Sequence, residues 1–338
     1  MGKKMDQIPY HFSVRTDLAV EAKELASERE QSEEVDGVEI SVEDLCGGKV
    51  KVTWVEVYNE AGSKAMGKPV GNYITIESEA MKENDIETHE SIMKILAKRL
   101  EKIRKLKKSS VVLVVGLGNW NVTPDALGPK VVSKILVTRH LSGNLPKELE
   151  GNVRPVGAIS AGVMGLTGIE TAEIIKGVTD RIKPDLVIAI DALAARRTNR
   201  VNSTIQISDT GINPGAGVGN KRMELSEQAL GVPVIAIGVP TVVDAATLVN
   251  DTMDRMLTAM LEQAQPGSEF FNMLGSLADE EKYHLITEIL NPYTGNMFVT
   301  PKEVDSVIER LANIIANGIN IALHPGIKMD DINRFIGA

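Results

Sequence analysis

The sequence has few of the residues from which disulfide frameworks and metal sites are built. Its 338 residues contain one cysteine, Cys46, and five histidines. A single cysteine excludes an internal disulfide and fits a reducing compartment. The histidines are scattered and include no spaced pair such as the HExxH zinc motif, so we expect structural roles for them and no bound metal or other cofactor.

The sequence also lacks a basic excess and a long apolar run. Its net charge is -9, which argues against a surface that grips nucleic acid, although an acidic enzyme can still attract basic protein substrates. No apolar run reaches the roughly 18 residues of a membrane span, and the basic N-terminus leads into no apolar core of a secretory signal. We therefore expect a cytoplasmic protein without direct nucleic-acid or membrane binding.

Two long buried strands are the strongest features that are present. Five apolar residues at 111–115 precede Gly116, and a similar run at 186–190 ends in Asp191. Continuous apolar runs of this length are typical of strands inside a parallel sheet. Ligands in such sheets bind beyond the carboxyl ends of the strands, where the first run is followed by a loop containing Asp125. Asp125 and Asp191 are therefore the candidate catalytic residues.

The order of elements predicts a three-layer α/β/α fold with a mostly parallel central sheet. Alternating apolar and polar residues at 35–80 predict accessory strands that extend the sheet at its edge or form a small separate sheet. A charged segment that begins near Thr16 and Asp17 predicts a solvated helix. Further helices are predicted at 88–107, 130–141, 169–182, 244–265 and 302–323, with a helical insertion at 266–300.

Known short motifs assign no other chemistry. The loop at 116–121 begins like a dinucleotide fingerprint, but Asn121 stands where that motif needs glycine for close helix packing. The sequence contains neither a phosphate-binding P-loop motif nor the Gly-x-Ser-x-Gly motif of serine hydrolases. A nucleotide- or nucleoside-processing enzyme stays open as an alternative because of the glycine-rich loops.

Two carboxylates that meet at one edge of a sheet can hydrolyse an amide. Their repulsion lets them share one proton, so that one carboxylate activates water while the other donates to the carbonyl oxygen. The structural alternative is that Asp125 caps a helix and that Asp191 is a hydrogen-bonded strand end. The residues alone leave these alternatives open.

Three long segments of the sequence resemble the germination proteases of spore-forming bacteria. They are residues 116–129, 189–196 and 209–220, and the likeness covers essentially the whole chain. The resemblance implies a homotetrameric endopeptidase that degrades small acid-soluble spore proteins in the spore core, after synthesis as a zymogen in the forespore. It also implies that Asp125 and Asp191 are the catalytic pair, on a fold related to the hydrogenase maturation proteases.

The resemblance gives the N-terminal segment a second interpretation. Family substrates are cut after an acidic residue in sites similar to Thr-Glu-(Ile or Phe)-Ala-Ser-Glu, and residues 16–21 mimic this pattern. We therefore predict self-cleavage between Asp17 and Leu18. Residues 1–17 are then the propeptide, and residues 18–338 form a single peptidase domain.

Several further residues are candidates for binding the substrate or the oxyanion. Backbone amides of the glycine-rich loop at 211–219 can approach a peptide closely, and an acidic residue at the cleaved position suggests an electropositive pocket. The candidates are Gly118, Asn119, Arg196, Gly215 and Gly217, with Arg197 and Lys221 as further cations.

Two other classes of protein remain possible from the sequence. A metal-dependent peptidase would also use aspartates, and its activity would be lost on chelation. A non-catalytic module that sequesters basic proteins would not cut a peptide at one defined bond.

Overall fold

The computed structural model describes residues 16–30, 32, 34–141, 151–213, 223–263 and 297–327. The chain divides into two compact units, one of residues 1–15 and 244–298 and the other of residues 16–243 and 299–338. Within the first unit, the described part is mainly the helix α8 (Ala245–Gln263), close to the helix predicted at 244–265. The insertion predicted at 266–300 lies mostly outside the described residues.

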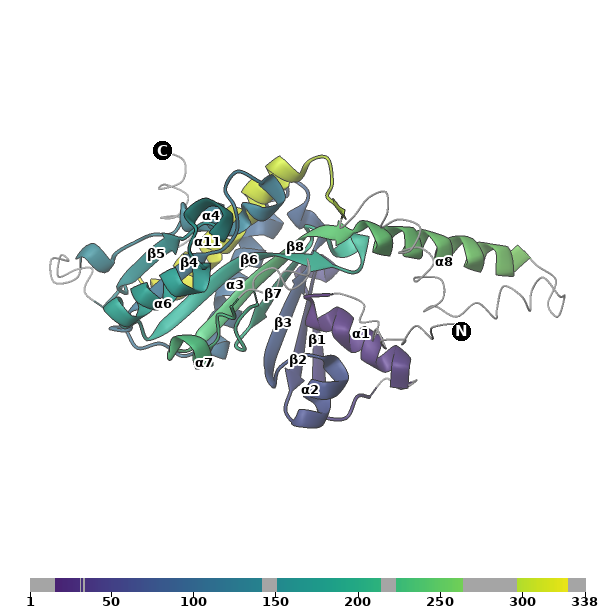
Figure 1. Ribbon diagram of the computed structural model, residues 1–338, viewed down its shortest axis with the longest axis horizontal. Helices are drawn as coiled ribbons and strands as arrows, with labels where there is room; N and C mark the ends of the chain where they lie inside the picture. The colour runs from purple at the N-terminus through teal and green to yellow at the C-terminus, as the bar shows by residue number, and fades with distance from the viewer. Residues whose placement is uncertain are drawn as a thin grey trace, which may run out of the picture. The chain divides into compact units, whose positions relative to one another are not determined.

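The second unit is built around one sheet in the order β1-β2-β3-β7-β8-β6-β4-β5 (Figure 1). The four strands β8, β6, β4 and β5 run parallel, as their continuous apolar runs predict. The other neighbours in this order, β1-β2, β2-β3, β3-β7 and β7-β8, pair antiparallel. The accessory strands β1 to β3 therefore extend the central sheet at its edge. The bounds are β1 (Val38–Leu45), β2 (Val50–Val57), β3 (Gly71–Glu77), β4 (Val112–Gly116), β5 (Val156–Ser160), β6 (Leu186–Ala195), β7 (Thr204–Ser208) and β8 (Val234–Asp244), with the two-residue β9 (Phe298–Val299) paired to β8.

Helices cover both faces of this sheet, which confirms the predicted three layers (Figure 1). On one face, α3 (Ile86–Ile103), α4 (Leu127–Val132) and α11 (Val304–Leu323) pack over the largest apolar cluster. On the other face, α6 (Thr171–Ile182) and α7 (Glu227–Leu230) cover the parallel strands, while α1 (Ala19–Glu30) and α2 (Glu60–Met66) cover the antiparallel ones. The even-numbered residues of β6 face the first layer and the odd-numbered ones face the second, because side chains alternate along a strand.

The first helix, α1, is not the solvated helix that its charge suggests. Ala19, Ala22 and Ala26 are buried against β2 and β3, and Leu18 just before the helix is fully buried. Because alanine is small, this face lets the helix approach the sheet closely without a large apolar stripe. In the sequence, the many charged residues of this segment hide the apolar face, because the face consists of small alanines.

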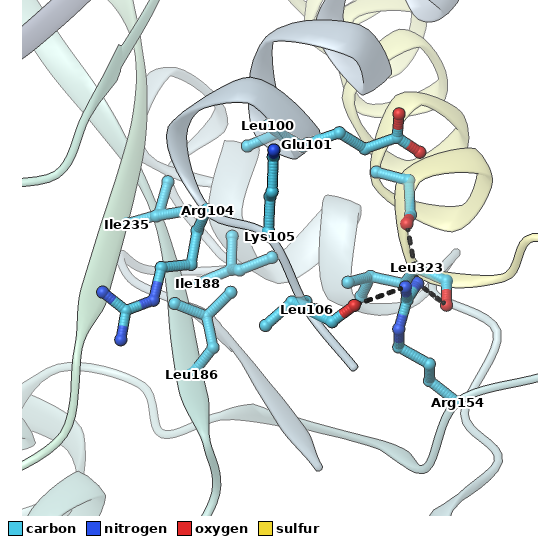
Figure 2. A pocket seen from close by; sticks show the side chains of 11 residues that line it. Leu100, Glu101, Arg104, Lys105, Leu106, Arg154, Leu186, Ile188, Ile235 and Leu323 are labelled. Carbon is cyan, nitrogen blue, oxygen red and sulfur yellow. Dashed lines mark hydrogen bonds between the residues drawn. The ribbon is translucent and has the colours of Figure 1, made fainter. Parts of the chain in front are cut away.

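The guanidinium of Arg154 joins the end of α11 to the segment that follows α3. It donates to the carbonyl oxygens of Ala322 and Leu323 at 3.0 and 2.8 Å, and to those of Leu106 and Lys107 at 3.3 and 3.0 Å. Figure 2 shows this side chain beside a cavity of about 300 Å³. The last carbonyl groups of a helix lack partners within the helix, so Arg154 satisfies acceptors at the end of α11.

His324, which follows α11, is fully buried and makes stability depend on pH. Its Nε2 lies 3.2 Å from the carbonyl oxygen of Leu136, which can only accept, so Nε2 carries the proton. Burial lowers the pKa of His324 to about 4, although the hydrogen bond to Leu136 opposes this change. Between pH 6.5 and 4 the unfolded chain therefore binds a proton that the folded chain does not, and stability falls as the pH falls.

We predict that His324→Gln flattens this pH dependence. The wild type should lose a few kcal/mol of unfolding free energy between pH 7 and 4.5 through this group, and the variant should lose correspondingly less. Urea unfolding at a series of pH values measures the difference. The matched control is His140→Gln at an exposed position, which should keep the wild-type slope; equal slopes for His324→Gln and wild type would contradict the prediction.

Candidate functional site

The two candidate aspartates lie at adjacent parallel strands. Asp191 lies within β6, which does not end there but continues to Ala195, and Asp125 lies in the short helical turn η3 (Thr123–Asp125) after β4. The amide of Leu117, just past β4, donates to the carbonyl oxygen of Ile190 at 2.8 Å, and η3 contacts β6. The loop that carries Asp125 is therefore held against the strand segment that carries Asp191.

Glycines allow this loop to pass close to the strands. A Cβ atom at Gly128 would lie 2.7 Å from the carbonyl oxygen of Ile190, and one at Gly116 would lie 2.3 Å from the carbonyl oxygen of Gly128. Gly118 has a φ of +108°, and a Cβ atom there would lie 2.0 Å from the carbonyl oxygen of Asp125. The glycines that resemble a dinucleotide fingerprint thus serve a close approach between β4, the loop and β6.

Asp125 is half-buried, and its side chain is held by its own loop. The amide of Asn119 donates to its Oδ2 at 2.8 Å and to its carbonyl oxygen at 3.1 Å. The residue that caps the following helix α4 is Ala126, which makes no side-chain capping bond. The alternative that Asp125 serves as the cap of this helix is therefore wrong, and Gly118 and Asn119 act on the geometry of the carboxylate.

Asp191 is 5% exposed and faces the layer of α6 and α1. Its Oδ1 accepts a hydrogen bond from the amide of Ala192 at 2.9 Å. Across the sheet it lies in one row with Gly238 of β8 and Gln206 of β7. A Cβ atom at Gly238 would lie 2.3 Å from the side chain of Leu193, so Leu193 occupies the space over Gly238 between these two polar residues.

The N-terminal segment with the predicted cleavage bond lies along the end of β6. The amide of Asp17 donates to the carbonyl oxygen of Ala194 at 3.3 Å, and the amide of Ala194 donates to the carboxylate of Asp17 at 3.0 Å. Burial raises the pKa of Asp17, partly offset by this hydrogen bond and by the charge of Lys68. Asp17 is thus bound three residues beyond Asp191 on the same strand.

Glu21 fixes the other end of this segment. It is fully buried, and its carboxylate accepts hydrogen bonds from the amides of Arg196 and Arg197 at 2.8 and 2.9 Å. The guanidinium of Arg200 lies 3.5 Å from the same carboxylate. The backbone of Arg196 and Arg197 therefore holds Glu21, while Lys68 is the cation whose charge acts on Asp17.

Arg200 also ties the segment to the sheet. It forms two hydrogen bonds to Glu24 of α1 at 2.7 and 2.9 Å and one to Glu77 of β3 at 2.9 Å. Burial alone would raise the pKa of Glu24, but the hydrogen bonds and charge of Arg200 lower it. A planar guanidinium suits this arrangement because it offers several donors in a fixed geometry.

Sequence reasoning missed Lys68 and Gln206. The Lys68 ammonium donates to the carbonyl oxygens of Thr16 and Asp17, and the Gln206 side chain contacts both Asp17 and Ala19. Lys68 follows a left-handed Gly67 that ends α2, and Gln206 occupies an ordinary alternating position of β7. One signal in the sequence could have indicated Gln206: it is a polar residue between the apolar residues Ile205 and Ile207 of a buried strand.

Three of the predicted site residues fall within residues 214–222, between β7 and β8 in the sequence. Gly215 and Gly217 of the glycine-rich loop, and Lys221, lie outside the described residues.

The cavity in Figure 2 is lined by Leu186 and Ile235, near the amino ends of β6 and β8. It therefore lies at the opposite end of the strands from Asp191 and is a separate feature.

In the part of the chain that the structure describes, no group of three or more histidine, cysteine, aspartate or glutamate side chains could hold a metal ion. Of its helices, none is long and apolar enough to cross a bilayer. His89 and His324 are buried and each contacts a backbone carbonyl oxygen, whereas His140 is exposed.

The model of one protein family, described as germination protease, matches residues 19–268 and 255–336. The chain belongs to the germination protease family. A germination protease of Clostridium tetani is 56% identical over 96% of this chain and all of that protein, and one of Bacillus cereus is 47% identical over 96% of this chain and 97% of that protein. The chain is therefore a spore protease that hydrolyses peptide bonds.

A NiFe hydrogenase maturation protease, HycI from Thermococcus kodakarensis, is a similar solved structure. It is 19% identical, with a TM-score of 0.32, and the match covers 65% of this chain and 98% of that one.

The close approach at Gly118 generates a prediction for this germination protease. Gly118→Ala should move the Asp125 loop, because the added methyl group meets backbone, and should lower the rate of peptide cleavage by about a hundredfold. The control is Gly177→Ala on an exposed face of α6, where no atom lies within 4 Å of the added methyl group. It should keep full activity and gain about 0.5–1 kcal/mol of stability. Full activity in Gly118→Ala would show that the loop tolerates the displacement.

Proposed function

We propose that this germination protease is made as a zymogen and starts the degradation of small acid-soluble spore proteins. It cuts after an acidic residue in sites similar to Thr-Glu-(Ile or Phe)-Ala-Ser-Glu, and it matures by cutting its own chain between Asp17 and Leu18. It acts as a homotetramer in the forespore and spore core, without a cofactor. The supporting observation is the binding of residues 16–21 along the end of β6, just beyond Asp191.

The residues that mimic the substrate pattern are the ones that make the specific contacts. Asp17, at the position of the cleaved acidic residue, is bonded to Ala194, and Glu21, at the position of the final glutamate, is bonded to Arg196 and Arg197. The hydroxyl of Thr16 donates to Glu21 and accepts from the amide of Leu18. The side chains common to propeptide and substrate are thus those that the fold recognises.

In the mechanism that we favour, Asp125 and Asp191 share one proton. The ionised carboxylate removes a proton from water, which attacks the scissile carbonyl carbon, and the protonated partner assists at the carbonyl oxygen. The convergence of the β4 loop and β6 at one edge of the sheet supports this pairing. Backbone amides of the glycine-rich loop at 211–219, including Gly215 and Gly217, are candidates for binding the substrate.

The aspartate pair is tested by Asp125→Asn and Asp191→Asn in the full chain. Each change removes a proton-transfer group and should lower self-cleavage and peptide cleavage by about 10²–10⁴-fold without unfolding the protein. Circular dichroism checks folding and mass spectrometry follows cleavage. Asp180→Asn, which removes an exposed carboxylate of α6, is the matched control and should cleave normally. Turnover at the wild-type rate in either site variant would remove that residue from the mechanism.

The cleavage position is tested by N-terminal sequencing of the matured enzyme. We expect the new N-terminus to be Leu18, because Asp17 is the acidic residue bound at the end of β6. A first residue other than Leu18 would reject this position while leaving the aspartate pair untouched.

The metal-dependent alternative makes a different prediction about chelation. Loss of activity in EDTA, restored by one particular divalent ion, would favour a metal mechanism over the carboxylate pair. Tight binding of a nucleotide would favour the nucleotide-processing alternative. Unchanged cleavage in EDTA is the result that the carboxylate pair requires.

A further inference from the structure

The carbonyl oxygen of Asp17 accepts hydrogen bonds from two side chains of different elements. The Nζ atom of Lys68 lies 2.9 Å away, and the Nε2 atom of Gln206 lies 3.1 Å away. This oxygen belongs to the peptide bond between Asp17 and Leu18. We infer that Lys68 and Gln206 form the oxyanion site for cleavage of this bond, an inference that depends on the proposed self-cleavage between Asp17 and Leu18.

The orientation of the Gln206 amide follows from its second contact. Its Oε1 accepts from the amide of Ala19 at 2.6 Å, and a backbone N–H can only donate. The NH₂ group must therefore face the carbonyl oxygen of Asp17. One side chain thus holds the peptide on both sides of Leu18, which fixes the carbonyl group between β7 and the end of β6.

Both donors are held in place before any reaction. Gln206 is 8% exposed and lies within β7, paired with β3 and β8. The backbone of Lys68 is fixed by Ser63, whose hydroxyl donates to the Lys68 carbonyl oxygen at 2.7 Å. Donors that need no rearrangement stabilise a developing negative charge more than mobile ones do.

The position of Gln206 relates this pair to the proposed catalytic aspartates. Gln206 and Asp191 lie in one row of the sheet and face the same layer, with Gly238 between them. Two strand spacings separate their backbones by about 10 Å, and the side chain of Leu193 lies over Gly238 between them. Donor and proton acceptor therefore lie on the same side of the sheet as the peptide bond.

The reaction is hydrolysis of the peptide bond between Asp17 and Leu18. The oxygen of water bonds to the carbonyl carbon of Asp17, one proton passes to an aspartate carboxylate, and the carbonyl electron pair moves onto the oxygen held by Lys68 and Gln206. As the electron pair returns, the bond to the Leu18 nitrogen breaks and that nitrogen takes the proton from the carboxyl group. Lys68 contributes a positive charge as well as a hydrogen-bond donor. Burial lowers the pKa of Lys68, and the negative charges of Asp17 and Glu21 partly oppose this change.

The test compares first-order self-cleavage rates of full-length variants. Lys68→Met and Gln206→Leu keep the size of each side chain but remove the donor, so each should slow the Asp17–Leu18 cut by about 10²–10³-fold. Lys68→Arg retains a charged donor and should recover part of the rate. Lys49→Met makes the same change at an exposed lysine and should cleave as the wild type does. Wild-type rates in folded Lys68→Met and Gln206→Leu would overturn the inference.

Anchoring must be separated from stabilisation of the oxyanion. Gln206→Glu keeps an acceptor for the Ala19 amide and loses the donor, so hydrogen exchange should still find that amide protected while cleavage is slow. Slow cleavage with an unprotected Ala19 amide, together with no recovery in Lys68→Arg, would assign both residues to anchoring and overturn the inference. If one donor variant fails to fold, the other decides the result.

Failure of this inference can be distinguished from failure of the proposed function. Wild-type chain that is cut elsewhere, or Asp125→Asn and Asp191→Asn chains that still cut, would reject the proposed function. Normal aspartate dependence and a new N-terminus at Leu18, with fast cleavage in Lys68→Met and Gln206→Leu, would reject the oxyanion site alone.

Discussion

The hydrogen bond from the Leu117 amide to the Ile190 carbonyl oxygen continues the pairing of β4 and β6 past the end of β4. It fixes where the following loop begins, and the glycines at 116 and 128 let that loop pack directly on the strands. The positions of Asp125 and Asp191 both depend on this contact. A side chain at either glycine would push α4 away from the strands, because a Cβ atom at Gly116 would meet the backbone of Gly128 and one at Gly128 would meet the backbone of Leu117 and Ile190.

The parallel core of the fold could be predicted from sequence because its strands are buried on both faces. Runs such as 111–115 have no polar face, and this run matches β4 to within one residue, whereas β6 continues beyond the run at 186–190 and beyond Asp191 as far as Ala195. The accessory strands were also predictable, since β1 to β3 alternate in polarity. What the pattern could not decide was whether they form a separate sheet, because that depends on the pairing of β3 with β7, which lie far apart in the sequence.

The site was only partly predictable for the same reason. Asp125 follows the buried strand β4, and Asp191 directly follows the apolar run at 186–190 within β6, so a sequence pattern can identify both positions. Lys68 lies in a turn and Gln206 in a strand, and only the three-dimensional path of residues 16–19 brings both to one carbonyl oxygen. The burial of α1 was hidden as well, because its packing face consists of alanines among charged residues.

Leu18 is fully buried, so the peptide bond on its amino side lies in surroundings with little water. Hydrolysis replaces that neutral amide with a carboxylate and an ammonium group, and ions are far costlier than amides to keep away from solvent. The freed ends therefore gain solvation by moving apart, which works against rejoining of the bond. Burial of one leucine would in this way make the proposed cut between Asp17 and Leu18 a one-way step, driven by the hydration of the charges that it creates.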